Sequence, residues 1–224
     1  FPWRIRLTLL PVRVIRFLRL CFLLPRFARE MTELLPKRLT KAKLPHKSLA
    51  EGEAKGKLGF IEGCVMQVMF GDTNESSVEL LNREGWDVIT PRRQGCCGAL
   101  YAHSGQLAKA RDCARRNIAV FESEPLDAII INASGCGTQV KDYGFMFRED
   151  AACAGKAARV SELAMDVSEY LSELSPDIAA FEDAASLRVT YHSACSMQHG
   201  QQIRTPPKAL LTAAGYTVSE PGEG

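Results

Sequence analysis

"LDAIIINASGCGTQ" (126–139) is an uninterrupted apolar run that ends in a glycine-rich turn containing Cys136. A short apolar run of this kind, bounded by small and polar residues, is typical of a buried strand. Three other stretches predict strands on the same grounds: "LGFIEG" (58–63), "WDVIT" (86–90) and "LRVTYH" (187–192).

The segments between these strands have the periodicity of amphipathic helices. We expect helices over 72–85, 106–123, 137–147 and 159–174, the first with Asp72 or Thr73 as its N-cap and Gly85 as its stop. Strands separated by helices indicate βαβ units and a parallel sheet, so the predicted fold class is α/β. In such sheets functional residues gather in the loops beyond the carboxyl ends of the strands.

An internal repeat organises the chain. "GCVMQ" (63–67) and "ACSMQ" (194–198) each follow a predicted strand, and "GWDVITP" (85–91) and "GYTVSEP" (215–221) each follow a helix at nearly the same interval. The chain is therefore predicted to hold tandem βαβ repeats. The expected domains are a basic helical connector and linker (1–57), a first cysteine-rich domain (58–185) and the truncated start of a second (186–224).

The N-terminal arm is strongly basic. Residues 1–47 contain 12 Lys or Arg and two acids, whereas the rest of the chain has an excess of acids. Its apolar runs are too short and too often interrupted by arginine for a membrane-spanning helix or a signal peptide. We interpret the arm as a helical connector that packs on a neighbour, with an interfacial membrane helix as the alternative. A nucleic-acid partner is not expected, because the rest of the chain is acidic.

The cysteines indicate reduced thiols. Eight cysteines in 224 residues are too few for a disulfide-stapled secreted protein, so a cytoplasmic location is expected. Cys96 and Cys97 are adjacent in "RRQGCCGALYAHSG" (92–105), which is too close for an ordinary disulfide. Grouped reduced thiols indicate metal binding, redox chemistry or catalysis, with chance burial as the alternative.

Four cysteines follow three predicted strands: Cys64, Cys96, Cys97 and Cys136. Loops after parallel strands open at one edge of the sheet, so we expect these thiols to converge. Soft thiolates suit zinc or an iron-sulfur cluster, but the Cys-x(2–4)-Cys pairs of structural zinc sites are absent. Two adjacent cysteines point apart, which favours a cluster with several irons. Cys195 is predicted to be a further ligand, and Tyr143 an ordinary packing residue of a helix.

The residues around these cysteines resemble one known family. "EGCVMQVMFGDTN" (62–74), "QGCCGALYAHSG" (94–105), "NASGCGTQVKDYG" (132–144) and "YHSACSMQHGQQIRTPP" (191–207) carry the resemblance. They are similar to the cysteine-rich CCG domain of heterodisulfide reductases, of lactate-utilisation proteins and of the iron-sulfur subunit of glycolate oxidase. The similarity is greatest to the last.

The resemblance implies an electron-transfer subunit with two N-terminal [4Fe-4S] ferredoxin-type motifs and two CCG domains. It would work beside flavin-containing subunits, with FAD on those partners, that oxidise glycolate to glyoxylate. Electrons would pass to a quinone or another membrane acceptor, at the inner face of the cytoplasmic membrane. The chain has no Cys-x2-Cys-x2-Cys run, so the ferredoxin part is expected upstream.

Two features leave alternatives open. Gln139 stands where the fullest form of the domain has its last cysteine, so a site with five thiolates is not expected. A thiol-disulfide enzyme of the heterodisulfide reductase kind and a metal-free docking scaffold are the alternatives to a cluster protein. No nucleotide-binding loop and no Gly-x-Ser-x-Gly motif is present, so substrate oxidation is not expected on this chain.

Overall fold

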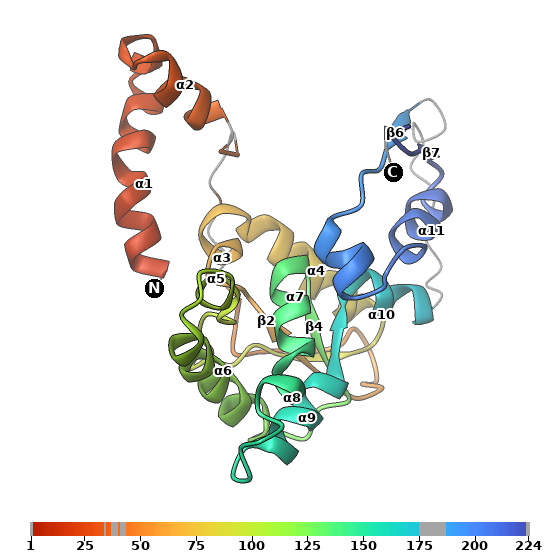
Figure 1. The fold of residues 1–224 in the computed structure, drawn as a ribbon. Helices are drawn as coiled ribbons and strands as arrows, with labels where there is room; N and C mark the ends of the chain where they lie inside the picture. The colour runs from red at the N-terminus through yellow and green to blue at the C-terminus, as the bar shows by residue number, and fades with distance from the viewer. Residues whose placement is uncertain (1, 34, 37–39, 41–43, 175–186, 223–224) are drawn as a thin grey trace.

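The chain folds into a mixed α/β body with a helical arm and a second small sheet (Figure 1). The computed structural model describes residues 2–33, 35–36, 40, 44–174 and 187–222. Within these residues, one sheet has the strand order β1-β3-β2-β4-β5 and the other pairs β6 with β7. The strands are β1 (Lys47–Ser48), β2 (Lys57–Ile61), β3 (Asp87–Ile89), β4 (Ala128–Ile131), β5 (Ala164–Asp166), β6 (Arg188–Thr190) and β7 (Thr217–Ser219).

Helices alternate with these strands, as the predicted α/β class requires. In the body they are α3 (Met66–Met69), α4 (Gly71–Arg83), α5 (Ala99–His103), α6 (Leu107–Phe121), α7 (Ser134–Lys141), α8 (Tyr143–Met146), α9 (Ala154–Leu163) and α10 (Val167–Leu174). Strands β2, β3, β4 and β5 run parallel, and β1 joins the edge of β3 antiparallel. The class predicted from the apolar runs is confirmed.

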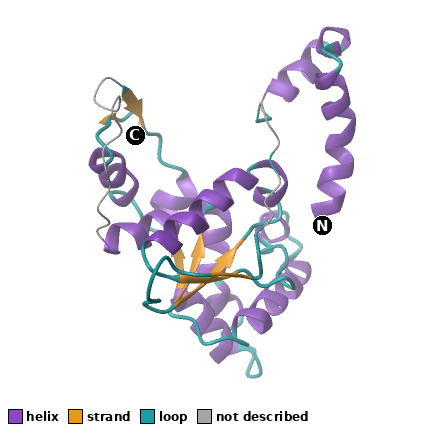
Figure 2. Cartoon of the chain, turned by 180° about the vertical axis from the view of Figure 1, so that it is seen from behind, coloured by secondary structure: helices purple, strands orange, loops and turns teal. Residues whose placement is uncertain are grey.

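The central strands are buried on both faces. Ile129 and Ile131 of β4 pack on one side with α6 to α9, and Ile130 packs on the other with α4 and α10. Figure 2 shows the strands lying between these helices. Because both faces are covered, β4 is apolar at every position rather than alternating.

Two local expectations are wrong. The segment predicted as one helix (159–174) is α9, β5 and α10, because Ala164–Asp166 pairs in parallel with β4. The helix expected over 72–85 is α4, which begins at Gly71 after Phe70 rather than after an Asp72 or Thr73 cap, since α3 leads directly into it. Gly85 ends that region as expected, in a left-handed conformation.

The second unit repeats the order strand, helix, parallel strand. It consists of β6, the π-helical turn η3 (Ser196–Gly200), α11 (Pro206–Ala213) and β7. Val189 faces Val218 across this pair as Leu58 faces Val88 in the first unit. The strands alternate exposed and half-buried residues instead of being buried throughout. The predicted domain boundaries remain predictions.

The basic arm is helical, as predicted. It consists of α1 (Pro2–Phe17), the short 3-10 turn η1 (Leu20–Leu23) and α2 (Arg26–Glu33), which together form a hairpin that stands away from the sheet (Figure 1). Among the described residues, no helix has both the length and the apolar character needed to cross a bilayer.

Candidate metal centre

Three turns at one edge of the large sheet carry four thiols. Cys64 lies in the turn between β2 and α3, the pair Cys96 and Cys97 in the loop between β3 and α5, and Cys136 in the first turn of α7, directly after β4. Strands β3, β2 and β4 are neighbours and run parallel, so these turns open at the same edge. The topology therefore brings together residues that are far apart in the sequence.

The four thiols approach one another as two pairs. The Cys64 Sγ lies 3.7 Å from the Cys96 Sγ, and the Cys97 Sγ lies 3.3 Å from the Cys136 Sγ. All four are free thiols. Cys97 is buried and the other three are half-buried. The thiols are therefore partly shielded from solvent.

Hydrogen bonds within each pair divide the thiols into donors and acceptors. The Cys64 thiol donates to Cys96, which raises the pKa of Cys64 and lowers that of Cys96. The Gly98 N–H, 3.4 Å from the Cys96 Sγ, adds to this lowering. Cys97 donates to Cys136, which raises the pKa of Cys97 and lowers that of Cys136. Cys96 and Cys136 are therefore stabilised as thiolates, the form that binds metals.

Two buried polar side chains hold the double-cysteine loop. The Tyr143 hydroxyl donates to the Cys97 carbonyl at 2.8 Å, and Asn117 Nδ2 donates to the Cys96 carbonyl at 3.3 Å. The Asn117 Oδ1 accepts from the Gly95 N–H at 2.8 Å. Both side chains are almost completely buried, so their hydrogen bonds hold the loop in place from the interior of the protein.

Sequence reasoning missed both of these positioning residues. Tyr143 was expected to be an ordinary packing residue, and Asn117 lies in an amphipathic helix where a polar residue usually faces solvent. The signal that was available is the position of Asn117 one turn after Cys113, on the apolar side of α6.

A glycine is required in the same loop. Gly98 has a φ of +93°, and a Cβ there would lie 2.9 Å from the Ala110 carbonyl oxygen on α6. The loop is thereby pressed against α6. Gln94 joins it to the end of β2, with Nε2 donating to the Phe60 carbonyl and Oε1 accepting from the Glu62 N–H, both at 3.0 Å.

The second unit contacts the helix that carries Cys136. Gln201 Nε2 donates to the Ser134 carbonyl at 3.0 Å, and the Ser196 hydroxyl donates to the Ser134 hydroxyl at 3.0 Å. A Cβ at Gly137 would lie 2.8 Å from Gln201 Nε2. The start of α7 is therefore held between β4 and the second unit.

The predicted ligand Cys195 lines a hollow that none of the other four thiols lines. It is exposed, and His192 and His199 also line this hollow of about 690 Å³. Gln139 is buried on α7 and lines a hollow of about 370 Å³ with Leu107 and Arg111.

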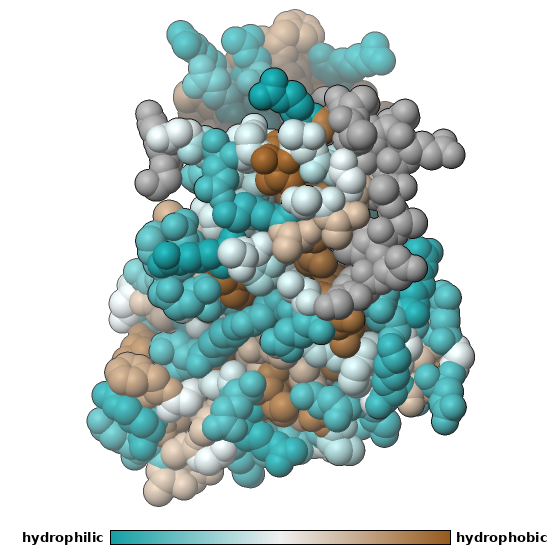
Figure 3. Space-filling view, turned by 90° about the vertical axis from the view of Figure 1, so that its right-hand side faces the viewer, coloured by the Kyte–Doolittle hydropathy of each residue, from teal (hydrophilic) through white to brown (hydrophobic). Residues whose placement is uncertain are grey.

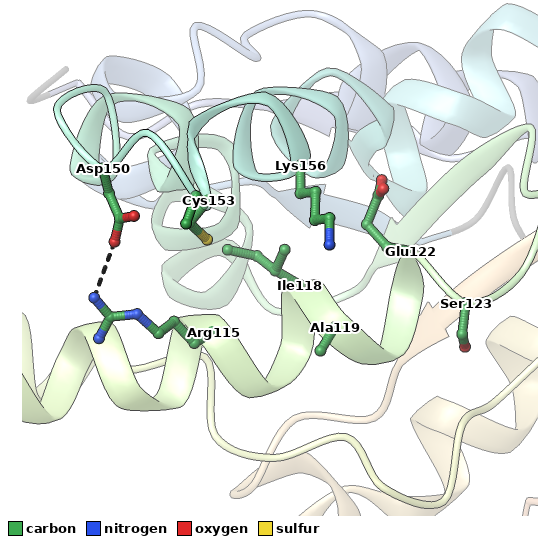
Figure 4. Close-up of a pocket in the computed structure, with 9 residues that line it drawn as sticks. Arg115, Ile118, Ala119, Glu122, Ser123, Asp150, Cys153 and Lys156 are labelled. Carbon is green, nitrogen blue, oxygen red and sulfur yellow. Dashed lines mark hydrogen bonds and ion pairs between the residues drawn. The ribbon is translucent and has the colours of Figure 1, made fainter.

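The remaining cysteines differ in their relation to the site. Cys113 is buried on α6; burial and the nearby Cys96 thiol raise its pKa. Cys153 lines a hollow of about 460 Å³ between α6 and the start of α9, where Arg115 pairs with Asp150 (Figure 4). Cys153 therefore offers a comparable thiol outside the site.

The four thiols have the donor chemistry that an iron-sulfur cluster requires, and three turns at one edge of the sheet carry them. In the part of the chain that the structure describes, no three His, Cys, Asp or Glu side chains surround a single metal-ion position. Two pairs of soft sulfur donors on three turns instead present separate ligands, as the irons of a cluster require.

Comparison with known proteins agrees with this geometry. The family model "Cysteine-rich domain", CCG, matches residues 58–141. The chain is 32% identical over 191 residues to the probable glycolate oxidase iron-sulfur subunit of Bacillus subtilis (strain 168), covering 84% of this chain and 43% of that protein. It is 33% identical over 189 residues to the glycolate oxidase iron-sulfur subunit of Escherichia coli (strain K12), covering 83% of this chain and 45% of that protein.

More distant relatives include lactate utilization protein A of Geobacillus sp. (strain WCH70), which is 25% identical over 158 residues, 69% of this chain and 64% of that protein. The chain spans less than half the length of the two glycolate oxidase subunits. No solved structure matches it. Residues 58–141 are thus similar to the cysteine-rich CCG domain, in a chain similar to proteins named glycolate oxidase iron-sulfur subunit.

Proposed function

We propose that this chain binds an iron-sulfur cluster through Cys64, Cys96, Cys97 and Cys136 and transfers electrons within an oxidoreductase complex. The observation that carries the proposal is the meeting of four free thiols from three turns, as pairs 3.7 and 3.3 Å apart. A [4Fe-4S] cluster is the type that four thiolates suit. Cys195 would serve a second centre of the repeated unit.

The complex we infer is of the glycolate dehydrogenase type. Relatives named glycolate oxidase iron-sulfur subunit support this assignment. Flavin-containing partner subunits, with FAD, would oxidise glycolate to glyoxylate, and this chain would relay the electrons toward a quinone-type acceptor. Its location would be cytoplasmic and peripheral to the membrane.

Each group of residues has a distinct task in this function. When bound, the cluster supplies reversible one-electron transfer. The two acceptor thiols, Cys96 and Cys136, hold negative charge at the site because hydrogen bonds lower their pKa values. Asn117 and Tyr143 keep the carbonyls of the double-cysteine loop turned away from the metal side. The packed helices α5 and α6 would exclude water from the inner side of the double-cysteine loop.

A second candidate function is direct thiol-disulfide chemistry. The 3.3 Å separation of the Cys97 and Cys136 sulfurs favours it. In that reaction Cys97 and Cys136 would be oxidised to a disulfide, losing two protons and two electrons, while a disulfide substrate is reduced to two thiols. A metal-free docking scaffold is the third; in that case Cys97→Ser would leave electron flow unchanged.

Iron and acid-labile sulfide, measured per chain with EPR on anaerobically purified protein, test the proposal. We expect iron and sulfide in equal amounts and a cluster signal, both lost in Cys97→Ser and retained in the control Cys153→Ser. Iron-free wild-type protein that consumes a disulfide substrate, with rapid alkylation of Cys136, would favour the thiol enzyme instead.

A further inference from the structure

The turn of the N-terminal arm exposes four large apolar side chains. Phe17, Leu18, Phe22 and Leu23 are 85, 53, 70 and 66% exposed. In Figure 1 this turn is the part of the arm farthest from the sheet. Figure 3, by contrast, shows a face of the body where hydrophilic residues predominate and hydrophobic ones are scattered. Exposed apolar side chains also lie along both helices of the arm, at Trp3, Leu7, Leu10 and Val14 of α1 and at Phe27 and Met31 of α2. The turn is thus the outer end of a longer apolar surface, of the kind that another body covers.

The charge around this turn is of one sign. Residues 2–29 contain seven arginines and no acidic residue. Arg13 and Arg19 are exposed close to the apolar turn. Arg16 donates to the Pro36 carbonyl at 2.8 Å, and Arg26 forms an ion pair with Glu30 at 2.8 Å. What covers the turn must accept apolar side chains and carry negative charge beside them.

We propose that this turn inserts into the surface of an anionic lipid bilayer. The phenyl and leucyl side chains would enter the boundary between headgroups and acyl chains, while the arginines would remain at the lipid phosphates. The 16-residue helix α1 spans roughly 24 Å, from the neighbourhood of Glu62 to the turn. The arm would thus hold the cysteine edge at a set distance from the bilayer.

An acidic helix of a partner protein is the competing occupant. Trp3, Leu7, Leu10 and Val14 are exposed at alternating spacings of four and three, which a partner helix could cover. Such a helix would cover α1 but leave Phe22 and Leu23 beyond its end. A second copy of the chain would place arginines against arginines. The arginines beside the turn favour the bilayer, because lipid phosphates would neutralise them.

Vesicle flotation of the full chain tests this inference. We compare vesicles of phosphatidylcholine alone with vesicles that also contain phosphatidylglycerol. The chain is expected to float with the anionic vesicles, less with neutral ones and less at high salt. Phe17→Ser with Phe22→Ser should weaken binding at least about tenfold. Arg13→Gln with Arg19→Gln should weaken it about fivefold per arginine.

The matched control is Leu100→Ser with Phe145→Ser, two apolar residues of the body that are 69 and 64% exposed. It should bind as the wild type does, and circular dichroism should show the same helix content in every variant. Absence of flotation with anionic vesicles overturns the inference. So does loss of vesicle binding in Leu7→Ser with Leu10→Ser but not in the turn variant, which would show that the face of α1, and not the turn, meets the bilayer. This inference deepens the proposed peripheral location, and because it does not depend on the cluster, vesicle binding and iron content can fail separately.

Discussion

The two βαβ units contain the same Cys-x-Met-Gln motif but place it in different surroundings. In the first unit Cys64 is half-buried and lies 3.7 Å from Cys96, at the end of strands buried on both faces. In the second unit Cys195 is exposed, and β6 and β7 form a sheet of two strands among the described residues.

In the first unit the motif supplies one thiol and the sheet brings the others to it. Cys64 has partners because β3 and β4 flank β2 and deliver Cys96, Cys97 and Cys136 to the same edge. In the described part of the second unit, only β7 flanks β6. In the first unit the cysteine motif is therefore part of a site because neighbouring strands bring further thiols to it.

The largest expected effect concerns equivalent valines in the two units. Val88 of β3 is completely buried, whereas Val218 of β7, at the corresponding position, is half-buried. Val88→Ala should reduce the free energy of unfolding by about 2–3 kcal/mol, because buried methyl groups are lost and a cavity remains. Val218→Ala should cost less than about 1 kcal/mol. Urea unfolding measures both; equal losses would show that the units are packed alike.

A smaller effect is expected from tyrosine hydroxyls. Tyr143→Phe removes the donor to the Cys97 carbonyl in a buried site, which should cost about 1–2 kcal/mol of stability. Tyr191→Phe in the second unit removes a contact to the Met197 sulfur, a weak acceptor, and should cost less than about 0.5 kcal/mol. The iron content of the first unit should fall only in Tyr143→Phe. An unchanged iron content in Tyr143→Phe would contradict the positioning role of Tyr143.

The smallest expected effect is on acid stability. A hydrogen-bonded ion pair with Lys47, helped by the Ala50 N–H, lowers the pKa of Asp87. The stabilisation by Asp87 is therefore complete above about pH 4, the ordinary aspartate pKa, and is lost as the pH falls through the lowered folded-state pKa. Asp87→Asn should make the free energy of unfolding less dependent on pH in that acid range.

The control is the Lys208–Glu220 ion pair of the second unit, whose carboxylate side chain is more exposed, 56% for Glu220 against 10% for Asp87. Glu220→Gln should change the acid unfolding curve little, because exposed ion pairs are screened by solvent. An equal shift of the pH midpoint of acid unfolding in the two variants would show that the two ion pairs stabilise their units equally.

The central fold could be predicted because its strands are continuous apolar runs. Residues 58–63 and 126–133 could hardly be anything other than buried strands, and their alternation with helices leads to a parallel sheet. Strand β5 could not be predicted, because Ala164–Asp166 lies within a stretch that has helical periodicity. Its pairing with β4 overrides that local preference.

The candidate site could be predicted in part. The meeting of Cys64, Cys96 and Cys136 follows from parallel strands and the loops after them. The support from Asn117 and Tyr143 could not be predicted, because a polar side chain on an amphipathic helix gives no sign of which buried carbonyl it contacts. That information exists only in the packing of α6 and α8 against the loop.

The most direct test of the account is differential alkylation with mass spectrometry, on iron-loaded protein and on the same protein after iron chelation. Cys97 is buried, so the readout depends on the half-buried Cys64, Cys96 and Cys136. We predict that these three are protected together in the iron-loaded protein and become reactive together after chelation, while Cys153 reacts alike in both. Equal reactivity of these three in both states would contradict a shared cluster.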